Sequence, residues 1–124
     1  MPNGRHPGFV ASFGFALQGI REALRGERNF KVMLAVAALA VVAGFVLRLD
    51  ALSWALVVLM IGLVLCAELL NTALETLVDL ASPQLHPLAK RAKDLAAGAV
   101  LVLCACVAVA GLAIYVRAAL LLAG

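Results

Sequence analysis

The chain has 124 residues, of which 65% are hydrophobic and 14% are charged, and its formal net charge is +3. A soluble domain is usually about half apolar and a quarter charged, so the composition excludes a soluble globular domain and indicates a membrane protein. The wealth of Leu, Val and Ala excludes a disordered chain. The three cysteines all lie inside apolar runs and argue against a disulfide scaffold. The net charge is modest, and we expect no nucleic-acid partner.

The first predicted element is an amphipathic helix over about residues 9–26. Apolar side chains recur there at steps of three or four, and polar residues fill the rest of the helix circumference. The apolar stripe consists of Phe9, Phe13, Leu17, Ile20 and Leu24. Such a helix is typical of a segment that lies on a membrane surface, and the alternative is a helix solvated on all sides. A cleavable signal peptide is not expected, because no uninterrupted apolar segment precedes Arg21.

Three apolar segments follow, and we expect each to be a transmembrane helix. They cover about residues 30–49, 52–80 and 88–117, and each is long enough to cross a hydrocarbon core of about 30 Å. None shows the alternation of a β-strand. Pro83 and Pro87 should end the second helix. The sequence therefore predicts an all-α integral membrane protein, with residues 1–124 forming a single domain.

The basic residues predict the orientation of the spans. Eight of them precede the first span or lie between the second and third, against two on the other side. The larger group is Arg5, Arg21, Arg25, Arg28, Lys31, Lys90, Arg91 and Lys93, and the smaller is Arg48 and Arg117. We therefore expect the amino terminus to be cytoplasmic and the carboxyl terminus to lie outside.

The second span continues beyond its apolar run as a helix with one polar edge. At about 100° per residue, four polar side chains fall within about 80° of arc. They are Glu68, Asn71, Glu75 and Asp79. Carboxylates near hydrocarbon are costly unless they are paired, hydrated or metal-bound. One interpretation is a structural network that pairs them with Arg28, Lys90 or Lys93, and the other is a site for Mg²⁺, which brings phosphates with it.

Other charged residues should meet this edge at the same membrane depth. Glu27 precedes the first span, and Lys93 and Asp94 begin the third. The chain contains neither of the glycine-rich phosphate-binding loops found in soluble nucleotide-binding proteins. If it handles ATP, it does so with helix side chains at the membrane interface.

Several strings at these positions resemble the prokaryotic diacylglycerol kinase family, and in particular its undecaprenol kinase branch. They are AELLNTALETLVDL at 67–80, HPLAKRAKDLAAGAV at 86–100, ERNF at 27–30 and FALQGI at 15–20. The resemblance covers about residues 12–116. It implies a membrane lipid kinase of the bacterial inner membrane that uses ATP and Mg²⁺. It also implies a homotrimer whose active sites are shared between protomers.

The resemblance also implies roles for individual residues. Glu68 matches the catalytic base that contacts the lipid hydroxyl, and Glu27 and Glu75 match the carboxylates that hold Mg²⁺ on the ATP phosphates. Lys93 and Asp94 match nucleotide-contacting positions. The remaining matches are Gln84, Leu85 and His86 against the nucleotide, and Asn71 and Ala97 near the lipid substrate.

The surface helix departs from the pattern of the diacylglycerol branch. That branch places an aromatic hydroxyl and basic residues near the nucleotide, where this chain has Phe15, Ala11 and Gly8. A phenol contact to ATP is therefore lost, and Phe15 is left as a packing residue.

Three functions are consistent with the sequence. The first is ATP-dependent phosphorylation of undecaprenol to undecaprenyl phosphate. The second is the same chemistry on diacylglycerol, which would give phosphatidic acid. The third is a non-catalytic membrane assembly protein whose carboxylates only lock helices together. For the kinase functions we expect Glu27 or Glu68 to work with Lys93 or Glu75 of a different protomer.

Overall fold

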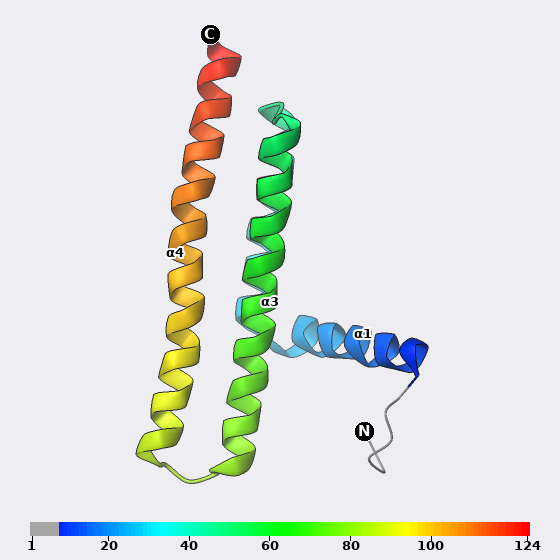
Figure 1. Ribbon diagram of the computed structural model, residues 1–124, viewed down its shortest axis with the longest axis vertical. Coiled ribbons are helices and arrows are strands. Elements are labelled where there is room, and N and C mark those ends of the chain that lie inside the picture. The colour runs from blue at the N-terminus through cyan, green and yellow to red at the C-terminus, as the bar shows by residue number, and fades with distance from the viewer. Residues whose placement is uncertain (1–7) are drawn as a thin grey trace.

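The computed structural model describes residues 8–124, which form four α-helices and no β-strand. The helices are α1 (Phe9–Gly26), α2 (Arg28–Val46), α3 (Ala51–Ala81) and α4 (Pro87–Ala123). In Figure 1, α3 and α4 run side by side, α2 lies behind α3, and α1 points away across the long axis of the bundle. The expected all-α architecture, with three apolar helices long enough to span a membrane, is confirmed.

The two longest helices exceed the thickness of a bilayer core. The 31 residues of α3 and the 37 residues of α4 correspond to about 46 and 55 Å, against a core of about 30 Å. Both helices extend past the level at which α1 leaves the bundle, toward the loop that joins them (Figure 1). We call this the loop end of the bundle, after the loop at 82–86. Each of the two helices is therefore long enough to reach beyond the hydrocarbon core.

A single extended residue, Glu27, separates α1 from α2. Its backbone has φ −106° and ψ 109°, which interrupts the helical path and turns α1 out of the bundle. Lys31 Nζ donates to the carbonyl oxygen of Arg25 across the junction at 3.2 Å. Glu27 therefore stands at the corner between the surface helix and the first span.

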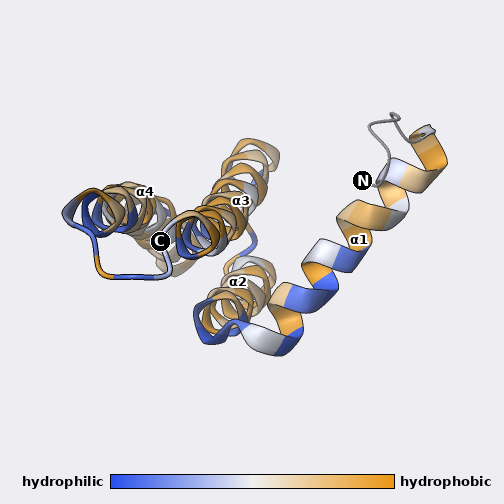
Figure 2. Ribbon diagram, turned by 90° about the horizontal axis from the view of Figure 1, so that it is seen from below, coloured by the Kyte–Doolittle hydropathy of each residue, from blue (hydrophilic) through white to orange (hydrophobic). Residues whose placement is uncertain are grey.

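The apolar stripe of α1 remains exposed in the isolated chain. Phe9 is 88% exposed and Phe13 is 61% exposed, and in the helix only Ala23 is buried. Figure 2 shows the alternation of hydrophobic and hydrophilic turns along this helix, away from the other three. An apolar stripe that stays largely exposed in the chain suits a helix that lies on lipid.

The end of the bundle opposite the loop, which we call the turn end, has a tight connection between α2 and α3. Arg48 adopts a left-handed backbone with φ 56°, which is uncommon for a residue other than glycine. Asp50 then caps α3 by accepting a hydrogen bond from the Ser53 backbone N–H at 2.8 Å. The side chain and the backbone N–H of Ser53 both donate to Asp50 and lower the pKa of its carboxyl group. Asp50 also pairs with Arg117 at 3.4 Å, which links the turn end of α3 to α4.

Packing within the bundle is sparse and centres on α3. Leu49, Val57 and Ala118 form the buried cluster, between the turn and the facing sides of α3 and α4. Tyr115 Oη donates to the carbonyl oxygen of Ala40 at 2.5 Å and joins α4 to α2. Most large apolar side chains face outward, where they can contact lipid or another subunit.

The helix bounds differ from the expected ones at two ends. Helix α2 ends at Val46 rather than near residue 49, because the left-handed Arg48 breaks the helical path. Helix α4 continues to Ala123 rather than ending near 117, since Ala and Leu follow Arg117 without a proline or glycine before Gly124. Of the basic residues that predict the orientation, Arg5 lies outside the described residues.

Candidate active site at the loop end

The polar edge of α3 contains two buried polar side chains. Glu68 is 3% exposed and Asn71 is 8% exposed, and the other buried polar residue within 8–124 is Ser53 at the turn end. Glu75 is partly buried and Asp79 is exposed. The edge therefore runs from a buried carboxylate inside the bundle to a hydrated one near the loop.

Three carboxylates converge at the buried part of this edge. Glu27, from the corner between α1 and α2, and Glu75, on the same helix edge, act on the Glu68 carboxylate through their charges. Asn29, in the first turn of α2, is near enough to Glu68 to influence its carboxyl group. Within residues 8–124 no salt bridge includes any of the three carboxylates. Three negative charges therefore lie near one another, and no protein cation forms a salt bridge with them within residues 8–124.

Asn71 has one hydrogen bond and one unsatisfied atom. Its Nδ2 donates to Glu75 Oε1 at 3.2 Å, while its Oδ1 is buried and has no partner. A buried acceptor without a partner costs about 1–3 kcal/mol. Such an atom calls for an explanation, and an acceptor site left for a ligand or another subunit is one.

The donor set at this convergence fits a hard cation that is shared with a phosphate. In the described part of the chain, no group of three His, Cys, Asp or Glu side chains is arranged as a closed metal site. Mg²⁺ does not require one, because it is commonly held by one or two carboxylates, with water and substrate phosphates completing its shell. Glu27 and Glu75 supply carboxylate oxygens of that kind. The carboxylates therefore suit a cation that binds together with substrate phosphates.

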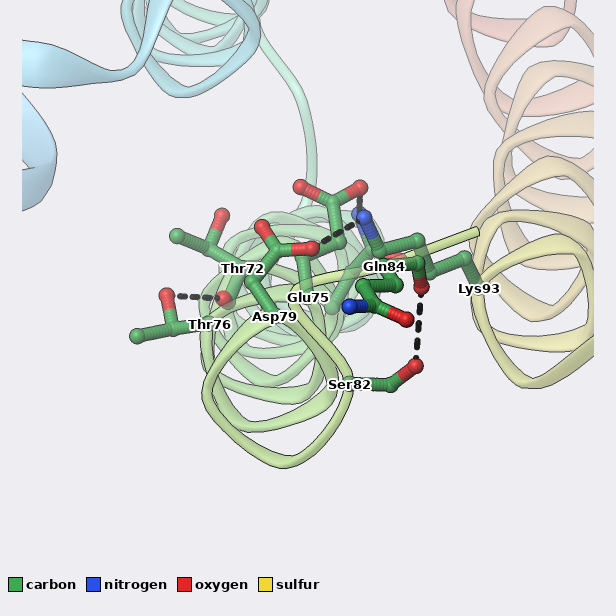
Figure 3. Close-up of polar contacts among 8 residues, drawn as sticks. Thr72, Glu75, Thr76, Asp79, Ser82, Gln84 and Lys93 are labelled. Atoms are coloured by element: carbon green, nitrogen blue, oxygen red, sulfur yellow. Dashed lines mark hydrogen bonds and ion pairs between the residues drawn. The ribbon is translucent and has the colours of Figure 1, made fainter. Parts of the chain in front are cut away.

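The basic side chains of the loop end pair with other carboxylates. Lys93 Nζ donates to Asp79 Oδ1 across the α3–α4 contact, and Figure 3 shows the two side chains meeting below Glu75. Lys90 Nζ pairs with Asp94 Oδ2 one turn along α4 at 2.6 Å. The structural network expected as the alternative is present in part, because Lys93 pairs with Asp79 of the polar edge, whereas Glu68 and Glu75 have no salt bridge within residues 8–124.

The loop at 82–86 is shaped by local hydrogen bonds. Ser82 Oγ donates to the carbonyl oxygen of Gln84 at 2.9 Å (Figure 3). The Leu88 backbone N–H donates to His86 Nδ1 at 3.1 Å, which makes His86 the cap of α4. Gln84, Leu85 and His86 are all exposed. Their assignment to the nucleotide stays a prediction.

A cleft of about 630 Å³ lies between α1 and α3 and includes Glu27 in its lining. Glu22 and Glu27 line it on one side, and Thr72 and Thr76 line it on α3. The Thr76 hydroxyl donates to the Thr72 carbonyl oxygen at 2.9 Å. The cleft is thus lined by both polar and apolar groups and reaches the corner residue Glu27.

The comparisons with known proteins show the family of the chain. The family model described as prokaryotic diacylglycerol kinase matches residues 14–115. The chain is 45% identical to the undecaprenol kinase of Bacillus subtilis over 107 residues, which cover 86% of this chain and 87% of that protein. The chain belongs to the prokaryotic diacylglycerol kinase family.

Other members of the family are similar over a shorter stretch. The diacylglycerol kinase of Synechocystis is 44% identical over 96 residues, which cover 77% of this chain and 55% of that protein. The diacylglycerol kinase of Escherichia coli K12 is 34% identical over 93 residues, which cover 75% and 76% of the two chains. Family membership confirms the resemblance seen in the sequence and accounts for the three apolar helices of a multi-pass membrane protein.

The structure separates the family's expected site residues into two groups. Glu27, Glu68, Asn71 and Glu75 come together at the buried part of the edge. Lys93, Asp94 and the loop lie at its exposed end, and Ala97 is exposed on α4, one turn after Lys93. Asn29 is not among the site residues that the sequence predicts, although it lies only two residues after Glu27. Phe15 is half exposed and does not line the cleft between α1 and α3.

Proposed function

We propose that this protein is a lipid kinase that transfers the γ-phosphate of ATP to the hydroxyl of undecaprenol, giving undecaprenyl phosphate. The observation that carries the kinase assignment is the convergence of Glu27, Glu68 and Glu75 without a protein counter-cation. Such a site is suited to a cation–phosphate complex, and phosphoryl transfer depends mainly on alignment and charge neutralisation. The choice of undecaprenol rests on the similarity to the Bacillus subtilis undecaprenol kinase.

Each residue of the buried group has a role in this proposal. Glu68, the deepest carboxylate, accepts the proton of the lipid hydroxyl as that oxygen attacks the γ-phosphorus. Asn71, whose Oδ1 has no partner, orients the lipid hydroxyl. Glu27 and Glu75 hold Mg²⁺ on the phosphates, where the bound ion would neutralise charge on the transferring group.

The exposed group binds the nucleotide. Lys93 offers an ammonium to the phosphates, and Asp94 and the loop residues Gln84, Leu85 and His86 contact the rest of ATP. Ala97, one turn further along α4, lies on the path to the lipid. The separation of about 10 Å along the axis between Glu68 and Glu75 suits a hydroxyl that arrives from the bilayer and a phosphate that arrives from water.

We further propose a homotrimer in the bacterial inner membrane with the loop end in the cytoplasm. The excess of basic residues near that end supports this orientation. An assembly of protomers would cover the outward-facing apolar side chains and the thin polar edge, which one protomer leaves partly open.

The test is a competition between lipid substrates. Purified protein in mixed micelles receives equal amounts of undecaprenol and diacylglycerol with radiolabelled ATP and Mg²⁺, and the labelled lipids are separated by chromatography. We expect label mainly in undecaprenyl phosphate, and none with Glu68→Gln. Label mainly in phosphatidic acid would instead support the second candidate, which the similarity to the Synechocystis diacylglycerol kinase favours. No labelled lipid from a folded protein would support a non-catalytic assembly protein.

A further inference from the structure

Asp79 is the one member of the polar edge to which the proposed function gives no role. It lies four residues beyond Glu75, about 6 Å further along the helix axis toward the loop. Its carboxylate accepts a hydrogen bond from the Lys93 ammonium of α4, and the pair closes the loop end of the two helices (Figure 3). The partner of Asp79 is therefore a side chain that the proposed function assigns to the nucleotide.

We propose that Asp79 is a positioning residue that holds the Lys93 ammonium in place for the phosphates of the nucleotide. This inference rests on the proposed function, because it needs Lys93 to contact ATP. Asp79 itself contacts neither substrate, and it acts through Lys93.

The exposure of the pair argues against a mainly structural role. The side chains of Lys93 and Asp79 are 40% and 64% exposed, and exposed ion pairs contribute little to stability. The pair affects the position of the Lys93 ammonium more than it affects the free energy of unfolding. A lysine side chain loses much rotamer freedom when it is fixed, and Asp79 imposes that loss before the nucleotide binds.

The geometry leaves the ammonium able to bind a phosphate while Asp79 holds it. A lysine ammonium has three N–H donors, and one of them points to Asp79 Oδ1. The neighbouring acid on α4, Asp94, is paired with Lys90 and does not compete for Lys93. Asp79 thus anchors one side of the ammonium and leaves its other donors available.

The opposite role for Asp79 would be to compete with the phosphates for Lys93, and it predicts the opposite result. If Asp79 positions Lys93, its loss weakens nucleotide binding. If it competes, its loss strengthens nucleotide binding. The sign of one measured change therefore separates the two roles.

The experiment compares Asp79→Asn with the wild-type protein in detergent micelles. The Kd for Mg-ATP is measured by calorimetry without lipid, and the KM for Mg-ATP and for lipid is measured in the kinase assay. We expect Kd and KM for Mg-ATP to rise about two- to fivefold, the range that an exposed ion pair can supply. The KM for lipid should stay unchanged, and Asp79→Glu should recover part of the loss.

The chain offers a matched control at the turn end. Asp50 also pairs α3 with α4, through Arg117, and its pair is similarly exposed. Asp50→Asn removes that pair but keeps a residue that caps helices well. It should leave the KM and Kd for Mg-ATP at wild-type values, because the turn end is far from the nucleotide.

A double variant tests the route through Lys93. In a Lys93→Ala background, Asp79→Asn should add no further loss of Mg-ATP affinity, because the residue that it positions is gone. Three results would each overturn the proposal: an unchanged or lower Kd in Asp79→Asn, an additive loss in the double variant, or an equal loss in Asp50→Asn. The proposed function fails separately if wild-type protein phosphorylates neither lipid, since the calorimetric comparison does not require turnover.

Discussion

Replacing Glu68 with glutamine should abolish turnover without weakening the fold. The substitution keeps the shape of the side chain and removes the charge that accepts the proton. Glu68 is 3% exposed, so bulk water has little access to replace it as a base. Loss of a general base costs about 10² to 10⁴ in rate, which corresponds to about 2.7–5.5 kcal/mol of transition-state stabilisation.

The same substitution should leave stability unchanged or raise it. Glu68 and Glu75 are two helical turns apart, about 10 Å along the axis. Two unit charges at about 10 Å repel by about 1.7 kcal/mol at an effective dielectric constant of about 20. Glutamine removes this repulsion and the one from Glu27, so the melting temperature should not fall.

The assay measures initial rates at saturating Mg-ATP and lipid, together with thermal unfolding and size-exclusion elution of each variant. Asp50→Asn, at the turn end, serves as the control for loss of a carboxylate away from the site. A rate for Glu68→Gln within about tenfold of the wild-type rate would refute its role as the base. A large drop in melting temperature would instead show that the carboxylate has a structural partner and that the repulsion argument is wrong.

Three further predictions follow from the geometry. Glu27→Gln and Glu75→Gln should each raise the Mg²⁺ concentration that gives half-maximal activity, since each removes a ligand of the ion; a Mg²⁺ titration with an unchanged midpoint in both would contradict the assignment. If Glu68 of one protomer works with Glu75 of another, mixing Glu68→Gln with Glu75→Gln protomers should restore partial activity, and no regain in crosslinked mixed trimers would show that both residues of a site come from one chain. Gly44→Ala should destabilise the protein by about 1–3 kcal/mol through overpacking, because the new Cβ would lie 2.7 Å from Trp54 Cη2; thermal unfolding in detergent would check it, and an unchanged melting temperature would mean that the tryptophan moves aside easily.

The fold could be predicted from the sequence because its main signals are local. The step of three or four between apolar residues marks α1, and long apolar runs mark α2, α3 and α4. The early end of α2 could not be predicted, because it depends on a left-handed backbone at Arg48. Arginine rarely adopts that conformation, so the residue type does not indicate it.

The candidate site could be predicted only in part. The helical period alone places Glu68, Asn71 and Glu75 on one edge. Contacts between helices depend on rotations and packing that the period does not fix. The pair of Lys93 with Asp79 spans 14 residues and a loop, and the approach of Asn29 to Glu68 needs the sharp corner at Glu27. The expectation that Glu68 and Glu75 act from different protomers stays a prediction, since two residues of one helix lie near each other in any assembly.

The corner at Glu27 connects the surface helix directly to one of the carboxylates of the candidate site. The surface helix and the first span meet through this one non-helical residue. Any tilt or change in depth of α1 among the lipid headgroups must be absorbed by the backbone of Glu27 or carried into α2. The carboxylate of the same residue is near enough to Glu68 for the two charges to repel each other. Lipid packing and curvature, which act on amphipathic helices, therefore bear directly on the spacing of the carboxylates.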